Sequence, residues 1–205
     1  MRIFIIGTGR AGSVSFIKAC KHISNYTCAH EQNVKKLGEE RFIFPDNHIE
    51  ADCRLAWFLG QVNEKFGKDA FYVHLTRNRD SIAKSYAKRY HLPVSIVRAF
   101  AEGIKMIPLP YLHHKNRLQN SYDYVDTVNA NINMFLANKP MSMEVHLENI
   151  KEEFKLFWHK INAEGDLNKA LEVFDVKHNA SPSRRKLKLH IWLKLSIYKV
   201  IRMFD

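Results

Sequence analysis

A strand, a glycine-rich turn and a helix follow one another at the start of the chain, and this order constrains the fold more than any other feature. Residues 2–6 (Arg-Ile-Phe-Ile-Ile) form a nearly continuous apolar run, which is typical of a buried strand in a parallel sheet. Residues 7–12 (Gly-Thr-Gly-Arg-Ala-Gly) form the turn, and residues 13–23 are expected to be helical with Ser13 as N-cap. Because glycines admit a ligand to the backbone and helix N-termini attract anions, the arrangement predicts a phosphate-binding site.

The rest of the chain alternates between strand and helix patterns. A length of 205 residues fits one domain spanning the whole chain. The alternation predicts an α/β fold with a parallel sheet and flanking helices. Further strands are expected at 26–30, 70–76 and 141–147, helices at 51–66, 79–90, 93–106, 122–137, 150–162 and 166–174, and a long loop at 107–120.

The formal net charge of +11 points to an anionic partner: a nucleic acid, an acidic polysaccharide, an anionic lipid or a phosphorylated cofactor. After a polar loop at 178–183, the sequence predicts a basic amphipathic helix at about 184–204. Three roles remain open for this helix. We rank docking on the protein core first, ahead of recruiting a polyanionic acceptor or contacting a membrane surface.

Three cysteines, Cys20, Cys28 and Cys53, show no CxxC spacing. Neither a disulfide framework nor a zinc site is expected, and reduced thiols favour a cytoplasmic protein. The first apolar run is too short for a signal peptide, and no segment has the length of a membrane span. The adjacent pair His113-His114 is not expected to bind metal, because no third ligand accompanies it.

Three phosphate-binding interpretations of the glycine turn can be compared with its residues. A Walker loop is excluded, because the turn lacks the final Gly-Lys-Ser/Thr. A dinucleotide fingerprint GxGxxG is matched by Gly7, Gly9 and Gly12, and Glu31 lies about 20 residues on, where a ribose-binding acid would be found. This match predicts, as an alternative, an NAD(P)-dependent oxidoreductase.

A third interpretation rests on the residues between the glycines. Residues 7–13 (Gly-Thr-Gly-Arg-Ala-Gly-Ser) resemble the 5′-phosphosulfate loop of sulfotransferases that use 3′-phosphoadenosine 5′-phosphosulfate (PAPS). Arg10 matches the basic residue, Ser13 matches the first hydroxyl, and Val14 departs from the second hydroxyl of many members. An arginine fork suits the negative charge that must be held as the sulfonate leaves. The resemblance implies that PAPS is bound by Gly9, Arg10, Ala11, Gly12, Ser13 and Val14.

A second segment favours the sulfotransferase interpretation over the dinucleotide one. Residues 71–86 resemble the 3′-phosphate segment of the same family, with Arg77 at the end of a strand and Ser85 eight positions later in a helix. Arg77 would leave the carboxyl edge of the sheet, where ligands of open α/β folds bind. Residues 145–150 resemble the family's late strand, in which Glu148 is structural, so the resemblance spans about residues 2–160.

Sulfonate transfer needs a base for the acceptor hydroxyl, and the family uses Glu or His. We favour Glu31 over His30, which precedes it directly after the second predicted strand. A glutamate, with an ordinary pKa of about 4.3, is ionised at neutral pH. Asp52 and Arg54 are hypothesised to position the acceptor. The late basic loop of the family would correspond to Arg184 and Arg185, over the 3′-phosphate.

The resemblance thus implies a nucleotide-kinase-like sulfotransferase architecture and a metal-free, in-line transfer of sulfonate from PAPS. Arg10 would support both binding and catalysis, and a hydroxyl of a glycan or glycolipid is the expected acceptor. A non-enzymatic alternative is a module that binds nucleic acid through the basic tail, with steep salt dependence. The chain has no recognisable nucleic-acid-binding motif, so no nucleic acid partner is expected.

Overall fold

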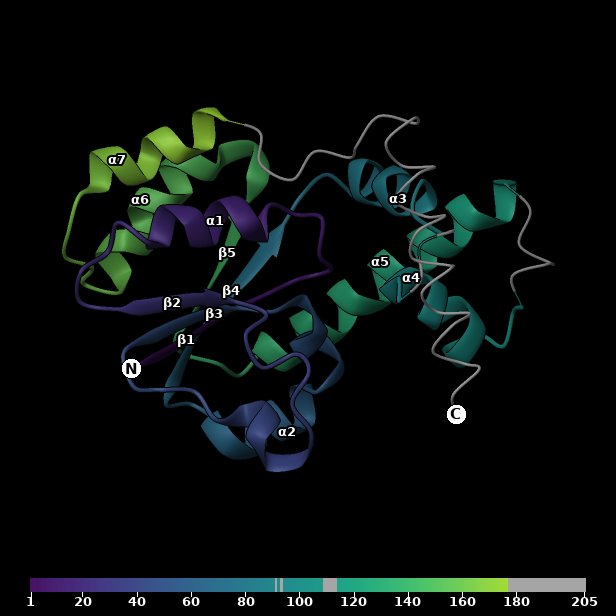
Figure 1. The fold of residues 1–205 in the computed structure, drawn as a ribbon, viewed down its shortest axis with the longest axis horizontal. Coiled ribbons are helices and arrows are strands. Elements are labelled where there is room, and N and C mark those ends of the chain that lie inside the picture. Colours follow the sequence, from purple (N-terminus) through teal and green to yellow (C-terminus); the bar gives the residue numbers. More distant parts are fainter. Residues whose placement is uncertain (91, 93, 109–113, 177–205) are drawn as a thin grey trace, which may run out of the picture. The chain divides into compact units, whose positions relative to one another are not determined.

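A computed structural model of the chain describes residues 1–90, 92, 94–108 and 114–176 (Figure 1). The predicted polar loop at 178–183 and the basic helix at about 184–204, with Arg184 and Arg185, lie outside these residues, as does His113. The described chain forms two compact units. The first combines Met1–Ile82 with the chain from Val125 onward, and the second comprises Ala83–Tyr124.

The first unit is built on a five-stranded, all-parallel sheet. Its strands, in the spatial order β2-β3-β1-β4-β5, are β1 (Arg2–Ile6), β2 (Thr27–His30), β3 (His48–Ala51), β4 (Ala70–Thr76) and β5 (Ser142–His146). The apolar run of β1 is central because each of its faces is buried, and Ile3 pairs with Ile49 on one side and Phe71 on the other. Four of the strands were predicted; β3 was not.

Two helices, α1 (Ser13–Cys20) and α6 (Ile150–Lys160), cover one face of the sheet, and α7 (Leu167–Glu172) packs against both of them (Figure 1). Phe16 of α1 packs edge-on against Phe154 and Phe157 of α6, with ring centroids 5.1 Å apart in each pair. These rings are fully buried, so they hold α1, and with it the end of the glycine turn, against the sheet.

The other face of the sheet is covered by α2 (Leu59–Phe66) and by the part of α5 (His114–Leu136) that follows Val125. Phe66 of α2 lies 4.7 Å from Phe4 of β1, centroid to centroid, and Phe135 of α5 lies 5.0 Å from Tyr72 of β4. Helices on both faces make the three-layer α/β architecture that the strand and helix alternation predicts.

The predicted helix at 51–66 was wrong in its first half. Residues up to Ala51 belong to β3, and a short 3₁₀ helix (Cys53–Trp57) precedes α2. Asp52 sets this boundary, because its backbone is extended and its Oδ1 accepts a 2.8 Å hydrogen bond from the backbone N–H of Arg54. Apolar residues recur at helical spacing throughout 51–66, although this segment contains the end of a strand, a 3₁₀ helix and α2.

The second unit is helical. It holds the end of α3 (Arg79–Ala87), the short α4 (Ile96–Ala99), a π-helical turn (Phe100–Ile104) and the start of α5. Tyr124 packs between Tyr86 and Phe100, at centroid distances of 5.1 and 5.6 Å. The helix predicted at 93–106 thus begins later, and α5 already begins at residue 114, inside the predicted loop. Within the described ranges, no helix combines the length and apolar character needed to cross a bilayer.

Candidate functional site

Three residues of the glycine turn after β1 have left-handed backbone conformations. Gly9, Arg10 and Gly12 have φ angles of 78°, 61° and 98°. Glycine adopts such angles readily, whereas Arg10 adopts them at a cost in backbone strain. The turn then leads directly into the N-terminus of α1, which adds the positive end of a helix dipole.

Two glycines hold this loop against neighbouring strands. A Cβ atom at Gly7 would lie 2.4 Å from the carbonyl oxygen of Leu75 in β4. A Cβ atom at Gly12 would lie 2.6 Å from Cδ1 of Leu147, just after β5. The close approach, and at Gly12 also the positive φ, explains why glycine is needed at these two positions.

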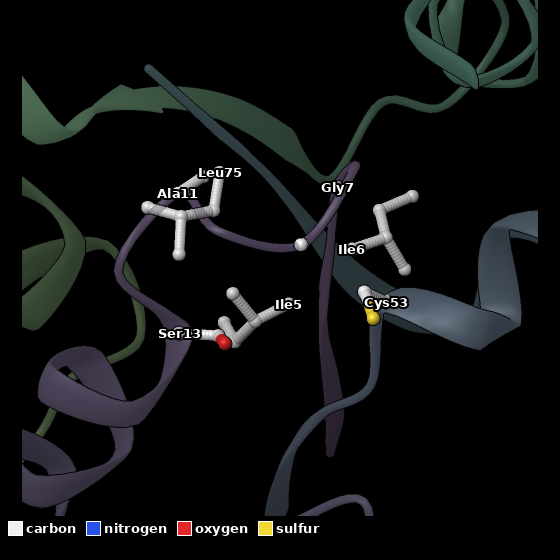
Figure 2. Close-up of a pocket in the computed structure, with 8 residues that line it drawn as sticks. Ile5, Ile6, Gly7, Ala11, Ser13, Cys53 and Leu75 are labelled. Atoms are coloured by element: carbon white, nitrogen blue, oxygen red, sulfur yellow. The ribbon is translucent and has the colours of Figure 1, made fainter. Parts of the chain in front are cut away.

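Ser13 is not the N-cap of α1, as the sequence predicted, because Gly12 takes that position in a left-handed conformation. Ser13 is instead the first helical residue, and its Oγ lies 2.9 Å from Nε2 of His30 at the end of β2. Ser13 also lines a small pocket with Ile5 and Cys53 (Figure 2). The cavity volume of about 10 Å³ has room for at most one water. A nucleotide would therefore have to lie outside it, along the loop.

Glu31 lies one residue beyond β2 in a conformation that non-glycine residues rarely adopt, with φ of 55°. Its Oε1 pairs with Nη1 of Arg54 at 2.8 Å and lies 3.4 Å from Sγ of Cys53, which donates to it. The structure thus brings together two predicted site residues, Glu31 and Arg54. Backbone strain of this kind clusters at functional sites.

The thiol and carboxyl groups beside Glu31 have shifted pKa values. Burial, followed by the negative charge of Glu31, raises the pKa of Cys53 to about 12. Burial also raises the pKa of Asp52, against the opposing effect of Arg41, with which Asp52 forms a buried ion pair. The Asp52 side chain is 0% exposed and contacts Arg41 and the Arg54 backbone, so its contacts are with the scaffold. A direct role for Asp52 in acceptor binding stays a prediction.

The second predicted phosphate-binding segment meets the first at the carboxyl edge of the sheet. Arg77, directly after β4, donates from Nη1 to the carbonyl oxygen of Arg10 at 3.4 Å. The next residue, Asn78, donates its backbone N–H to Oε1 of Glu148 at 2.9 Å, and its Oδ1 accepts from the backbone of Ser81. Glu148 therefore anchors the start of α3. Ser85 lies on α3 in the second unit, and its convergence with Arg77 stays a prediction.

The order of the strands argues against the dinucleotide interpretation of the glycine turn. In a dinucleotide-binding fold, the strand that follows the first helix pairs with the first strand and carries the ribose-binding acid. Here β2 pairs with β3, and β3 separates it from β1. Glu31 therefore lies one strand away from the position that the fingerprint requires.

Sequence reasoning missed three polar residues that support the Glu31 region. Arg41, His48 and Glu50 are 5%, 3% and 0% exposed. The signal for the last two was the alternation in His48-Ile49-Glu50-Ala51, which is typical of a strand. In the part of the chain that the structure describes, no group of three or more His, Cys, Asp or Glu has the arrangement of a metal site.

Comparisons with known proteins found likeness in structure and not in sequence. No protein-family model matches the chain, and no curated protein matches it. Among solved structures, a sulfotransferase domain from the curacin biosynthetic pathway is similar, with a TM-score of 0.60 and 12% sequence identity. The match covers 88% of this chain and 80% of that domain. The chain therefore has the α/β fold of a sulfotransferase domain, as the two phosphate motifs predict.

Proposed function

We propose that this chain is a sulfotransferase that moves a sulfonate group from PAPS to an acceptor hydroxyl. The observation that carries the proposal is the contact between Arg77 and the Arg10 carbonyl, because it joins two motifs that lie far apart in the sequence. Both arginines lie at the carboxyl edge of a sheet whose fold is shared with a sulfotransferase domain.

The donor would be held at its two charged ends. The loop from Gly9 to Val14 would bind the 5′-phosphosulfate through backbone N–H groups, the Arg10 guanidinium and the Ser13 hydroxyl. Arg77 and Ser85 would bind the 3′-phosphate, and Arg184 and Arg185 would close over it. Arg10 would also stabilise the charge that develops on the bridging oxygen as it leaves.

Glu31 would be the catalytic base in a direct in-line transfer. The acceptor oxygen forms a bond to sulfur, the bond from sulfur to the 5′-phosphate oxygen breaks, and the acceptor proton passes to the Glu31 carboxylate. Arg54 orients this carboxylate through Oε1, which leaves Oε2 to take the proton. His30 is the alternative base, supported by its 2.9 Å contact with Ser13. The proposed acceptor is a sugar hydroxyl of a glycan or glycolipid.

Calorimetric binding of adenosine 3′,5′-bisphosphate, the desulfated product, tests the donor site. We expect the bisphosphate to bind to wild type. Arg77→Ala should lower its affinity by roughly 10- to 100-fold, because the 3′-phosphate loses a charged hydrogen-bonding partner. Arg79→Ala is the matched control, because the Arg79 guanidinium pairs with Asp126 through two 2.6 Å contacts. It should leave the affinity unchanged. Binding of NAD or NADP without bisphosphate binding would establish the dinucleotide alternative instead.

Transfer assays with sulfur-labelled PAPS and a panel of p-nitrophenyl glycosides test the chemistry. Glu31→Gln should lower kcat by roughly 10²- to 10⁴-fold, the usual contribution of a general base, while bisphosphate affinity persists. His30→Gln should have the smaller effect. A larger loss of kcat in His30→Gln than in Glu31→Gln would make His30 the base. Small and equal losses in both variants would mean that neither residue takes the proton.

A further inference from the structure

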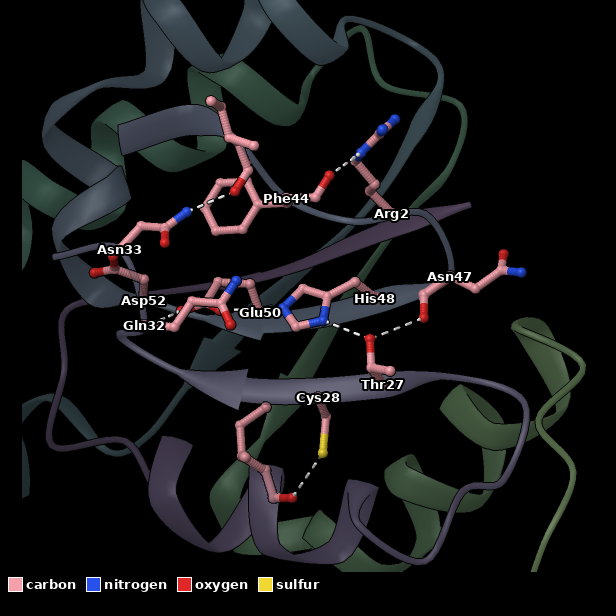
Figure 3. Close-up of polar contacts among 12 residues, drawn as sticks. Arg2, Thr27, Cys28, Gln32, Asn33, Phe44, Asn47, His48, Glu50 and Asp52 are labelled. Carbon is pink, nitrogen blue, oxygen red and sulfur yellow. Dashed lines mark hydrogen bonds and ion pairs between the residues drawn. The ribbon is translucent and has the colours of Figure 1, made fainter. Parts of the chain in front are cut away.

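A histidine and a glutamate of β3 are buried side by side on one face of the sheet. The glutamate contacts Gln32, the residue that follows Glu31 (Figure 3). His48 and Glu50 lie two positions apart on β3, so their side chains share one face of the sheet. They are 3% and 0% exposed, and the His48 ring stacks on Phe44 at a centroid distance of 6.2 Å. Ionisable groups are rarely buried this fully, and none of the phosphate motifs includes them.

Stability alone does not account for this pair. Oε2 of Glu50 lies 3.3 Å from Nε2 of His48, whose Nδ1 lies 2.8 Å from Oγ1 of Thr27 on β2. These contacts offset the cost of removing a carboxylate from water, yet apolar residues of similar volume often stabilise a core equally well. Glu50 makes one further contact, a hydrogen bond through its Oε1, which an apolar residue could not make.

That contact is made to the backbone of the Glu31 turn. Oε1 of Glu50 accepts a 3.1 Å hydrogen bond from the backbone N–H of Gln32, and the backbone N–H of Glu31 donates to Ala51 at 3.0 Å. The Cα atom of Glu31 therefore lies between two backbone amides, its own and that of Gln32, and each of them is hydrogen-bonded to a residue of β3. This double attachment holds Glu31 in its strained, positive-φ conformation, which persists only where the surrounding structure fixes it.

Fixing these two amides also fixes the direction of the Glu31 side chain, which meets Arg54 and Cys53. We propose that Glu50, itself held by His48, is a positioning residue that keeps the Glu31 carboxylate in place to accept the acceptor proton. This inference rests on the proposed function, because it assigns Glu50 a task in the same reaction. Glu50 acts through Glu31 and does not touch the reacting atoms.

The test compares variants of the full chain by kcat, by KM for the best p-nitrophenyl glycoside and by bisphosphate affinity. We expect Glu50→Ala to lower kcat by roughly 10- to 100-fold, the effect of a small displacement of a catalytic group. Glu50→Gln retains an oxygen for the Gln32 amide and should restore most of kcat. KM and bisphosphate affinity should stay within about twofold of wild type, because only the transition state needs the aligned base.

His48→Gln and His74→Gln form a matched pair. His74 lies on β4, is also 3% exposed and bonds Oδ1 of Asn129 at 3.2 Å, remote from the Glu31 turn. We expect His48→Gln to lower kcat and His74→Gln to lower stability without changing kcat. A double-mutant cycle adds the decisive comparison: in a Glu31→Gln background, Glu50→Ala should lower kcat no further.

Amide hydrogen exchange at Gln32 provides a readout that does not depend on turnover. It should accelerate in Glu50→Ala and stay unchanged in His74→Gln. If the alanine variant does not fold, His48→Gln allows the same comparison, because it removes the group that holds Glu50. Wild type that lacks transfer activity overturns the proposed function. If wild type is active, two results would overturn the positioning role alone. Glu50→Ala would leave kcat unchanged, or it would lower kcat equally in wild type and in the Glu31→Gln background.

Discussion

At the scale of single residues, the side chain of Glu31 has two partners that report on its charge. Arg54 pairs with it, and the thiol of Cys53 donates to the same oxygen. A sequence can place Glu31 after a strand, but it cannot show these partners, because both come from the chain after the unpredicted β3. The Cys53 thiol is the more useful reporter, since its chemistry can be measured directly.

Cys53 should resist alkylation in wild type and react faster when the Glu31 charge is removed. With a pKa of about 12, roughly one Cys53 thiol in 10⁴ is a thiolate at pH 8, and only the thiolate attacks iodoacetamide. Glu31→Gln removes a charge that raises this pKa, so we expect several-fold faster labelling by peptide mass spectrometry. Cys28 is the internal control, because its contact is the carbonyl of Ile17. If alkylation of both thiols accelerated equally, the substitution would have loosened the fold as a whole and not only removed a charge beside Cys53.

At the scale of elements, the strands with apolar runs were the most predictable, and β3 was not predicted. β1 and β4 were predicted with their bounds, because nearly every residue in them is apolar. β3 (His48–Ala51) was missed, because two of its four residues are ionisable and their partners lie on other segments. Burial of a charged strand depends on tertiary contacts, which local pattern does not contain.

The glycine turn should tolerate alanine at neither Gly7 nor Gly12, for different reasons. Gly7→Ala meets a backbone oxygen at 2.4 Å, so we expect it to cost at least about 2 kcal/mol and to weaken bisphosphate binding. Gly12→Ala meets the Leu147 side chain, and Leu147→Ala should relieve the clash while the strain of φ +98° remains. Denaturant unfolding and calorimetry measure both effects.

Gly60→Ala is the control for these two variants. Gly60 is the second residue of α2, and a Cβ atom there would have no neighbour within 4 Å. We expect it to stabilise the protein by about 0.5–1 kcal/mol, because alanine loses less conformational entropy in a helix than glycine does. Destabilisation by Gly60→Ala, or stability unchanged by Gly7→Ala, would contradict this account of the turn.

At the scale of the whole molecule, one buried histidine should contribute to the pH dependence of folding. Burial lowers the pKa of His74 from its ordinary 6.5, against the hydrogen bond to Asn129. The unfolded chain therefore binds a proton more readily than the native one as pH falls below 6.5. His74 contributes its full stability above that pH and loses it as pH falls through the folded pKa.

Comparing wild type with His74→Gln isolates this contribution. Between pH 7 and 5, the free energy of unfolding of wild type should fall more steeply, by at most about 1.4 kcal/mol per pH unit for one proton. The two curves should run parallel above pH 7. Parallel curves through the acid range as well would mean that His74 binds a proton equally readily in the native and the unfolded protein.

The global arrangement was predictable only in part. Alternating strands and helices predict a parallel sheet, and the two arginine-bearing motifs predict a site at its carboxyl edge. The order of the strands was not predictable, because a chain pattern does not say whether the second strand neighbours the first. That order argues against the dinucleotide interpretation, whereas the literal GxGxxG match alone was compatible with both interpretations.

The position of β2 also has a consequence for the order in which the chain folds. Within the described sheet, β2 pairs with β3 alone, and residues 31–47 separate the two strands in the sequence. Residues 27–30 can therefore join the sheet only once β3 is available to pair with them. The strand that leads into Glu31 is an edge strand held by a single neighbour, and local opening of a sheet begins at such edges. Assembly of the proposed base thus requires that β3 is already in place.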